Sequence, residues 1–203
     1  MRFLKYFLYA MFSVSVFSAG LCIFAPWDEG VNLAFHAVRL EAARRGYYVT
    51  YDGVERDGFF PPSYRFGELD VEGPMAKATF SDVVVKLEPA ASALSRSASF
   101  HAAFGGSAVR YIPNGGFALE RGQMDISAGK GIIAVSDADI KGDVNITGDM
   151  VLNAEEGSIT ESTMYIGVPP EMGAILGSPA MNRFVESVSP GKWRIRENAG
   201  GIR

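Results

Sequence analysis

Apolar residues follow three different patterns along the chain. Residues Tyr6 to Ala25 are uncharged and rich in aromatic and aliphatic side chains. From residue 27 to residue 46 apolar residues recur every three or four positions, which predicts an amphipathic helix. From residue 47 to residue 203 the dominant period is two, which predicts β-strands. We therefore expect a membrane anchor with its flank in residues 1–26, a membrane-proximal helix in 27–46 and a β domain in 47–203.

The uncharged segment has the length of a membrane span. A helix of twenty residues rises ~30 Å, about the thickness of the hydrocarbon core of a bilayer. Arg2 and Lys5 precede the segment, whereas Asp28 and Glu29 follow it. The positive flank predicts a cytoplasmic amino terminus, with everything from about residue 27 onward on the far side of the membrane.

Cleavage of this segment is an alternative to its retention as an anchor. Ser18, Ala19 and Gly20 offer small residues for a signal peptidase. The apolar run continues beyond them to Phe24, which favours retention. A lipoprotein is not expected, because Leu21 rather than a small residue precedes Cys22, which is the single cysteine of the chain and excludes an internal disulfide.

The helix after the anchor has a defined start, face and end. Asp28 is a candidate N-cap, and Arg44 and Gly46 mark a cationic last turn and a stop. The residues expected on its apolar face are Val31, Ala34, Phe35, Val38 and Ala42. Two more short helices are candidates, at Pro89–Ser97 and at Pro169–Val188, the latter with an apolar stripe of Met181, Phe184, Val185 and Val188.

Alternation is clearest in three segments of the β domain. In the first, Arg65, Gly67, Leu69 and Val71 are expected on one face, and in the second Thr79, Ser81, Val83, Val85 and Leu87. The third runs from Ile140 to Leu152 and is predicted to be one strand, or two about a kink at Gly148, with a dry face of Ile140, Val144, Ile146, Met150 and Leu152.

Many short strands separated by glycine-rich turns complete the pattern. Gly105-Gly106 and Gly129-x-Gly131 are expected to be hairpin turns, since neither precedes a helix that could bind a phosphate. The fold class predicted is mainly β: a single N-terminal transmembrane helix followed by an antiparallel curved sheet, either a jelly roll or an open β-groove, with one to three short helices.

The residues with reactive side chains form no catalytic pattern. His36 and His101 have no zinc-site spacing, and Cys22 lies in the anchor, so no Cys-His pair exists. Alternation places Asp137, Asp139, Asp143 and Asp149 along one polar face, spread at ~6.6 Å or more, which indicates a solvated strand rather than a calcium site. We expect no enzyme, no metal and no cofactor.

Charge narrows the class of partner. The formal net charge is −4 and no run of basic residues occurs, which argues against nucleic acid.

Several motifs in this order are similar to a known family. GFFPPSYRFGELDVEGP (58–74) follows the helix, and ATFSDVVVKLEP (78–89) follows that. Further motifs are FALERGQMDI, DADIKGDVNITGDMVLN and GSITESTMYIGV, with GKWRIREN (191–198) as a closing strand. Together they resemble the type II secretion system protein N (GspN) family. The resemblance implies a single-pass inner-membrane protein of a diderm bacterium with a periplasmic β domain, associated with the secretion apparatus, and it carries over no catalytic residues.

Two functions fit these observations. The first is a structural or assembly partner of the inner-membrane platform, which binds other secretion proteins by strand addition, with Arg65–Glu72 and Thr79–Glu88 as candidate edges. The second is lipid binding or transfer, because AsmA-like and lipopolysaccharide-transport-like proteins hold acyl chains on a curved sheet. Here Ile140, Val144, Ile146, Met150 and Leu152 would line the groove, unless another sheet layer or the Met181–Val188 helix covers them as core.

Overall fold

The computed structural model describes residues 27–44, 46–59, 61–74, 76–89, 91–92, 97–111, 115–179 and 181–197. The expected anchor, Tyr6–Ala25, lies outside the described residues, as does most of the helix candidate at Pro89–Ser97. Among the described helices, none combines the length and the apolar character needed to span a bilayer.

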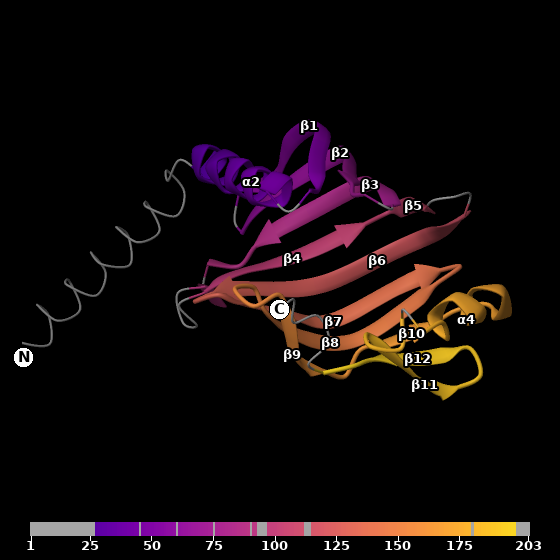
Figure 1. The fold of residues 1–203 in the computed structure, drawn as a ribbon. Helices are drawn as coiled ribbons and strands as arrows, with labels where there is room; N and C mark the ends of the chain where they lie inside the picture. The colour runs from indigo at the N-terminus through magenta and orange to yellow at the C-terminus, as the bar shows by residue number, and fades with distance from the viewer. Residues whose placement is uncertain are drawn as a thin grey trace, which may run out of the picture.

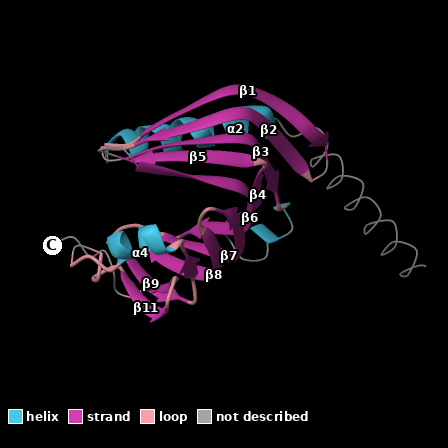
Figure 2. Cartoon of the chain, turned by 90° about the vertical axis from the view of Figure 1, so that its right-hand side faces the viewer, coloured by secondary structure: helices cyan, strands magenta, loops and turns pink. Residues whose placement is uncertain are grey.

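One antiparallel sheet dominates the described chain (Figure 1). Its main path runs β1-β2-β3-β4-β6-β7-β8-β10-β12-β11, while β5 pairs with β3 and β6, and β9 pairs with β8. Figure 2 shows that the sheet is bent into an open curve. The elements are α2 (Trp27–Arg44), β1 (Tyr48–Phe59), β2 (Pro62–Glu72), β3 (Ala76–Leu87), β4 (Ala98–Phe104), β5 (Gly106–Tyr111), β6 (Gly115–Gly129), β7 (Ile132–Gly142), β8 (Asn145–Asn153), β9 (Ser158–Ser162), β10 (Tyr165–Gly167), α4 (Pro170–Leu176), β11 (Val185–Ser189) and β12 (Lys192–Ile195).

The mainly β fold class is therefore confirmed, and the open form of the sheet is the one found. All twelve strands belong to a single sheet, so the described chain does not form the two layers of a jelly roll.

The helix α2 packs on one end of the sheet through an aromatic cluster. The Phe35 ring lies 4.8 Å from the Phe66 ring and 5.7 Å from the Tyr51 ring, between centroids. The Tyr64 hydroxyl donates a hydrogen bond of 2.8 Å to the Asp28 carboxylate at the start of the helix. Burial, and then this bond, raise the pKa of Tyr64 to about 12. Local periodicity and tertiary contacts thus agree on where α2 docks.

Two details of α2 differ from the prediction. Asp28 lies inside the first turn rather than before it, and its carboxylate accepts a hydrogen bond from the Tyr64 hydroxyl. Val38, expected on the buried face, is exposed, whereas Val31 is buried and Phe35 half-buried. The prediction for Val38 was therefore wrong, although the neighbouring Arg39 lies over the Tyr51 ring of β1, 5.9 Å from its centroid.

Directly opposed residues place apolar side chains on one face of the sheet, called here the apolar face. Opposed residues of antiparallel strands lie on the same side of a sheet. One row is Val54, Phe66 and Val83 on β1–β3, continuing as Phe104, Gly122, Ile140, Ile146, Ile166 and Trp193 from β4 to β12. A second row is Leu87, Phe100, Ile126, Val135 and Met150 from β3 to β8.

A line across the first strands, called here the crease, interrupts the alternation. At each crossing consecutive residues are exposed: Asp52 to Glu55 on β1, Gly67-Glu68 on β2 and Ser81-Asp82 on β3. Asp52, Glu68 and Ser81 oppose one another, and Gly53 and Asp82 have positive φ of 60° and 53°. This conformation turns the strand. If odd-numbered residues face the apolar side before the crease, even-numbered residues do so after it, and the reverse.

The crease explains why the predicted faces of the first two strand segments were wrong. Phe66 and Leu69 both pack on the apolar face, although they differ in parity, because the crease lies between them. For the same reason Phe80 joins Val83 there. A one-residue shift exchanges the two faces of a strand, so a local irregularity defeats a simple count of alternate residues.

The structure of Gly105-Gly106, next to the crease, differs from the predicted hairpin turn. These residues do not form a hairpin turn, because β4 and β5 both run antiparallel to β6 in one continuous register. They separate two collinear strands, and the Gly105 N–H donates to the Ser81 carbonyl at 3.1 Å. The opposing break in β6 is a register shift between Leu119 and Arg121. By contrast, Lys130-Gly131 does form the expected turn, between β6 and β7, with φ of 51° and 74°.

Two further predictions need correction. The segment Ile140–Leu152 is not one strand, because Asp143 and Val144 form a turn between β7 and β8, where the Asp143 carboxylate accepts the Ala118 N–H at 2.8 Å. The helix expected over Pro169–Val188 ends at Leu176, and Val185–Ser189 is strand β11. Pairing of β11 with β12 overrides the helical spacing of Met181, Phe184, Val185 and Val188.

The edges of the sheet are not where we expected them. Arg65–Glu72 lies in β2 and all of Thr79–Glu88 except Glu88 lies in β3, and both strands have neighbours on both sides. Along the main path the terminal strands are β1 and β11.

Candidate functional site

The five residues predicted to line a groove lie on the apolar face. Ile140 and Val144 are buried, and Ile146 is half-buried against the same cluster. Met150 and Leu152 are half-buried further along β8, opposite Val135 and Ile133. The structure thus brings the first three together in one cluster, whereas Met150 and Leu152 lie outside the described cluster.

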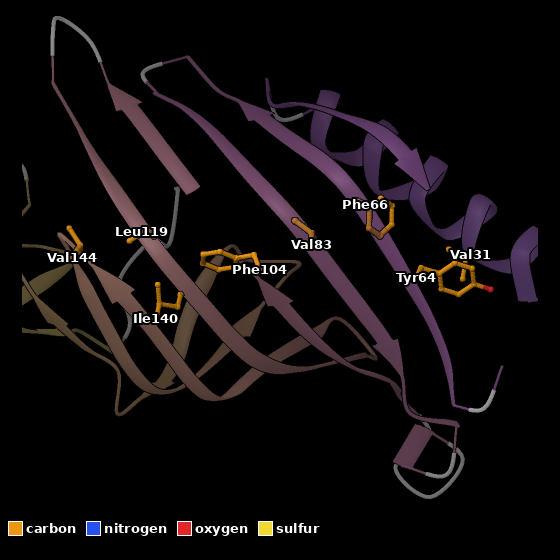
Figure 3. Close-up of a cluster of buried hydrophobic side chains, with 8 residues drawn as sticks. All are labelled: Val31, Tyr64, Phe66, Val83, Phe104, Leu119, Ile140 and Val144. Carbon is orange, nitrogen blue, oxygen red and sulfur yellow. The ribbon is translucent and has the colours of Figure 1, made fainter. Parts of the chain in front are cut away.

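Figure 3 shows a cluster of buried side chains that extends across the sheet from Val31 and Tyr64 to Val144. The buried cluster contains Val31, Tyr64, Phe66, Val83, Phe104, Leu119, Ile140 and Val144. The Phe104 ring stands edge-on to Phe80, with 5.2 Å between centroids. Gly122 admits this ring, since a Cβ at that position would lie 2.3 Å from two of its atoms. Packing is therefore tight where β4, β6 and β7 meet.

Helices pack on the apolar face at its ends. At one end α2 covers Tyr51 and Phe66. At the other, Met172 of α4 packs on the cluster, and Gly177, just after α4, approaches the ring of Trp193 in β12. Between them, the second row retains half-exposed apolar side chains: Phe100, Ile126, Val135 and Met150.

The outer face near β1 is acidic. Asp52, Glu55 and Asp57 of β1 are exposed, with Arg56 as the one cation of that strand. Asp52 directly opposes Glu68, an arrangement of like charges that is unfavourable in a sheet. In the described part of the chain neither carboxylate forms an ion pair. We call β1 with these carboxylates the acidic edge.

Other charges of this region are compensated. Arg65 pairs with Asp82 at 2.8 Å and with Asp57 at 3.7 Å, and Lys77 pairs with Asp70 at 2.8 Å. Hydrogen bonds from Lys77 and then from Thr79 lower the pKa of Asp70. Of the exposed carboxylates of β1, Asp57 is therefore paired, and Asp52 and Glu55 form no ion pair among the described residues.

The candidate ionisable residues do not converge. Asp149 accepts the backbone N–H of Asp137 at 2.9 Å, while Asp139 pairs with Lys141 at 3.5 Å. His101 and Asp125 are neighbours on β4 and β6, with Nδ1 and Oδ1 2.6 Å apart. In the described ranges no group of three or more histidines, cysteines and carboxylates is arranged to hold a metal ion.

One comparison with known proteins covers nearly the whole chain. A family model described as type II secretion system protein GspN-like, Synergistales, matches residues 4–197. The chain belongs to this GspN-like family. The family resemblance inferred from the strand motifs is confirmed. Searches of curated proteins and of solved structures found no match.

Membership of the GspN-like family connects the chain with type II secretion and with the proteins of that system. Reasoning from the sequence missed the acidic edge, because alternation does not reveal strand order. The sequence nevertheless contains a signal for the acidic edge. Asp52, Glu55 and Asp57 come just after the point where the hydrophobic period changes to two.

Proposed function

We propose that this GspN-like protein is a membrane-anchored structural or assembly component of a type II secretion system. The observation that carries the proposal is the open acidic edge on a family member: a twelve-residue strand, β1, with a neighbour on one side in the described sheet. Unpaired strand edges bind other chains by main-chain hydrogen bonds. The role proposed is binding rather than catalysis.

Its proposed location follows from the apolar segment Tyr6–Ala25 and its charged flanks. The anchor would span the inner membrane once, with the amino terminus in the cytoplasm and the β domain in the periplasm. This arrangement holds β1 close to the membrane, because α2 alone separates it from the anchor.

The charge of the acidic edge selects the partner. A second copy docked edge to edge would bring two sets of Asp52 and Glu55 together, which is unfavourable. An extended segment that carries lysine or arginine is favoured instead. We therefore propose that β1 receives a basic strand from another secretion protein.

Proline substitution on β1 tests the edge. Successive strand residues point their N–H groups alternately to each side, so of Val54→Pro and Glu55→Pro one removes a bond to β2 and the other alters the free side. The variant that alters only the free side of β1 should keep the wild-type melting temperature. It should nevertheless lose secretion components from affinity-purified membrane complexes, as identified by mass spectrometry. Val188→Pro, on the opposite edge strand β11, is the matched control and should keep them.

Two outcomes would count against the proposal in different ways. Retention of the partners by both β1 variants would exclude this edge as the binding surface. Failure of the wild-type chain to capture any secretion component would exclude the assembly role itself.

Lipid binding is a second candidate, favoured by the half-exposed middle of the apolar face. Burial of each aliphatic side chain is worth ~1.5–3 kcal/mol, so an acyl chain lying along Ile126, Val135 and Met150 would be stabilised. Native mass spectrometry of the protein released from detergent should then show co-purified lipid. Ile126→Ser with Met150→Ser should reduce the lipid-bound fraction, and an unliganded mass for the wild-type protein would oppose this function.

A further inference from the structure

Exposed apolar side chains are concentrated next to the proposed anchor. Among the described residues nine large hydrophobic side chains are exposed, and five of them lie between residues 33 and 48. They are Leu33, Val38, Leu40, Tyr47 and Tyr48. Single exposed apolar residues are ordinary on a protein surface, but a group of this size in one short segment indicates an interaction surface.

Leu33 and Leu40 lie on the side of α2 opposite to Val31. Each helix residue advances about 100°, so Leu33 stands about 200° from Val31, which packs on the sheet, and Leu40 falls close to Leu33. Their exposed fractions are 71% and 52%. The helix therefore has two apolar sides, and the sheet uses only one.

The surface continues from α2 onto the start of β1. Leu40 and Tyr48 line a shallow concavity of about 250 Å³, together with His36, Arg39, Ala43, Val49 and Thr50. Tyr48 is 64% exposed. We call Leu33, Leu40 and Tyr48 the outer stripe.

The position of α2 in the chain identifies the occupant. The uncharged segment Tyr6–Ala25 ends two residues before α2 begins, so a chain anchored there keeps the start of the helix within about 7 Å of the bilayer surface. The interface accepts leucine side chains among the acyl chains and tyrosine at the level of the headgroups. Arg44, exposed at the end of the helix, can reach the phosphates.

We infer that α2 lies along the outer surface of the inner membrane, with the outer stripe in the headgroup region and the sheet held above it. This contact would make the helix a second attachment, which orients the β domain rather than leaving it free on a tether. The inference rests on the membrane anchorage proposed above.

Site-specific labelling in vesicles tests this contact with the full-length chain. Cys22→Ala removes the native thiol, and a single cysteine is introduced as Leu33→Cys or Leu40→Cys and labelled with an environment-sensitive fluorophore. Ile132→Cys is the matched control, because Ile132 is apolar and 50% exposed at the turn between β6 and β7. The vesicles contain phosphatidylcholine and phosphatidylglycerol, with or without lipids that carry a quenching spin label.

In the fraction that floats with the vesicles, the labels at positions 33 and 40 should shift to the blue. Spin-labelled lipid should quench them about twofold more than the label at position 132. Floating protein with equal quenching at all three sites would overturn the inference alone. A blue shift without lipid quenching would show that a protein partner or a second copy covers the outer stripe, and it too would overturn the membrane contact. A chain that does not float would overturn both the contact and the anchorage.

Discussion

Single residues control the packing of the apolar face. Gly122 is the clearest, because a methyl group there would meet the Phe104 ring at 2.3 Å and Ile140 at 3.0 Å. We expect Gly122→Ala to lower the free energy of unfolding by about 1–3 kcal/mol through overpacking. Gly106→Ala, whose nearest neighbours lie 3.9 Å away, is the control and should change it by less than about 0.5 kcal/mol. Urea titration of both variants measures the difference.

Tyr64 makes stability depend on pH in a narrow alkaline range. Its pKa rises from 10.0 to about 12 in the folded protein, so the folded state keeps a proton that the unfolded state loses. The resulting stabilisation is fully present below pH 10 and disappears as the pH rises through 12. Tyr64→Phe removes the titrating group. The free energy of unfolding of this variant should fall less between pH 10 and pH 12 than that of the wild type, and equal slopes would exclude the Tyr64 contribution.

At the scale of elements, the crease depends on backbone conformation more than on side-chain contacts. Gly53 has a φ of 60°, and a Cβ added there would have no neighbour within 4 Å. Gly53→Ala should therefore lower the free energy of unfolding only through backbone strain. We expect a loss of about 1 kcal/mol for a residue with a side chain in this region. Gly67→Ala on the neighbouring strand is the matched substitution: its φ is not in the left-handed range, and its Cβ would sit 3.5 Å from the Asp52 carbonyl oxygen. Equal losses in the two variants would contradict this explanation of the crease.

At the scale of the whole molecule, the two proposed contacts differ in their response to salt. The Debye length falls from about 10 Å at 0.1 M to about 3 Å at 1 M ionic strength. Binding of a basic strand to the acidic edge should weaken over that range, whereas the apolar contact of the outer stripe should persist. Co-purification of secretion components and lipid quenching of a label at Leu40 can be measured on the same preparation. Loss of both signals in parallel would mean that they report a single surface.

Sequence patterns predicted the kinds of element well and their arrangement poorly. The period of 3.6 located α2, since Val31 and Phe35 pack as a local rule requires. Alternation located the strands, but a positive φ at Asp82 reversed the predicted faces, and no local pattern marks an aspartate for that conformation. The edges were mistaken because strand order depends on contacts distant in sequence. Val185 shows the same limit, since its pairing partner Ile195 outweighs helical spacing.

The crease has a consequence for how such sequences diverge. Each affected strand carries one additional outward residue at the same level, so a strand that gained or lost a residue there would fall out of register with the strands beside it. Relatives should therefore change length at these levels in several strands together or not at all. The positions equivalent to Gly53, Gly67 and Asp82 would then be inherited as a set, and gaps placed strand by strand in an alignment would misassign which residues face inward.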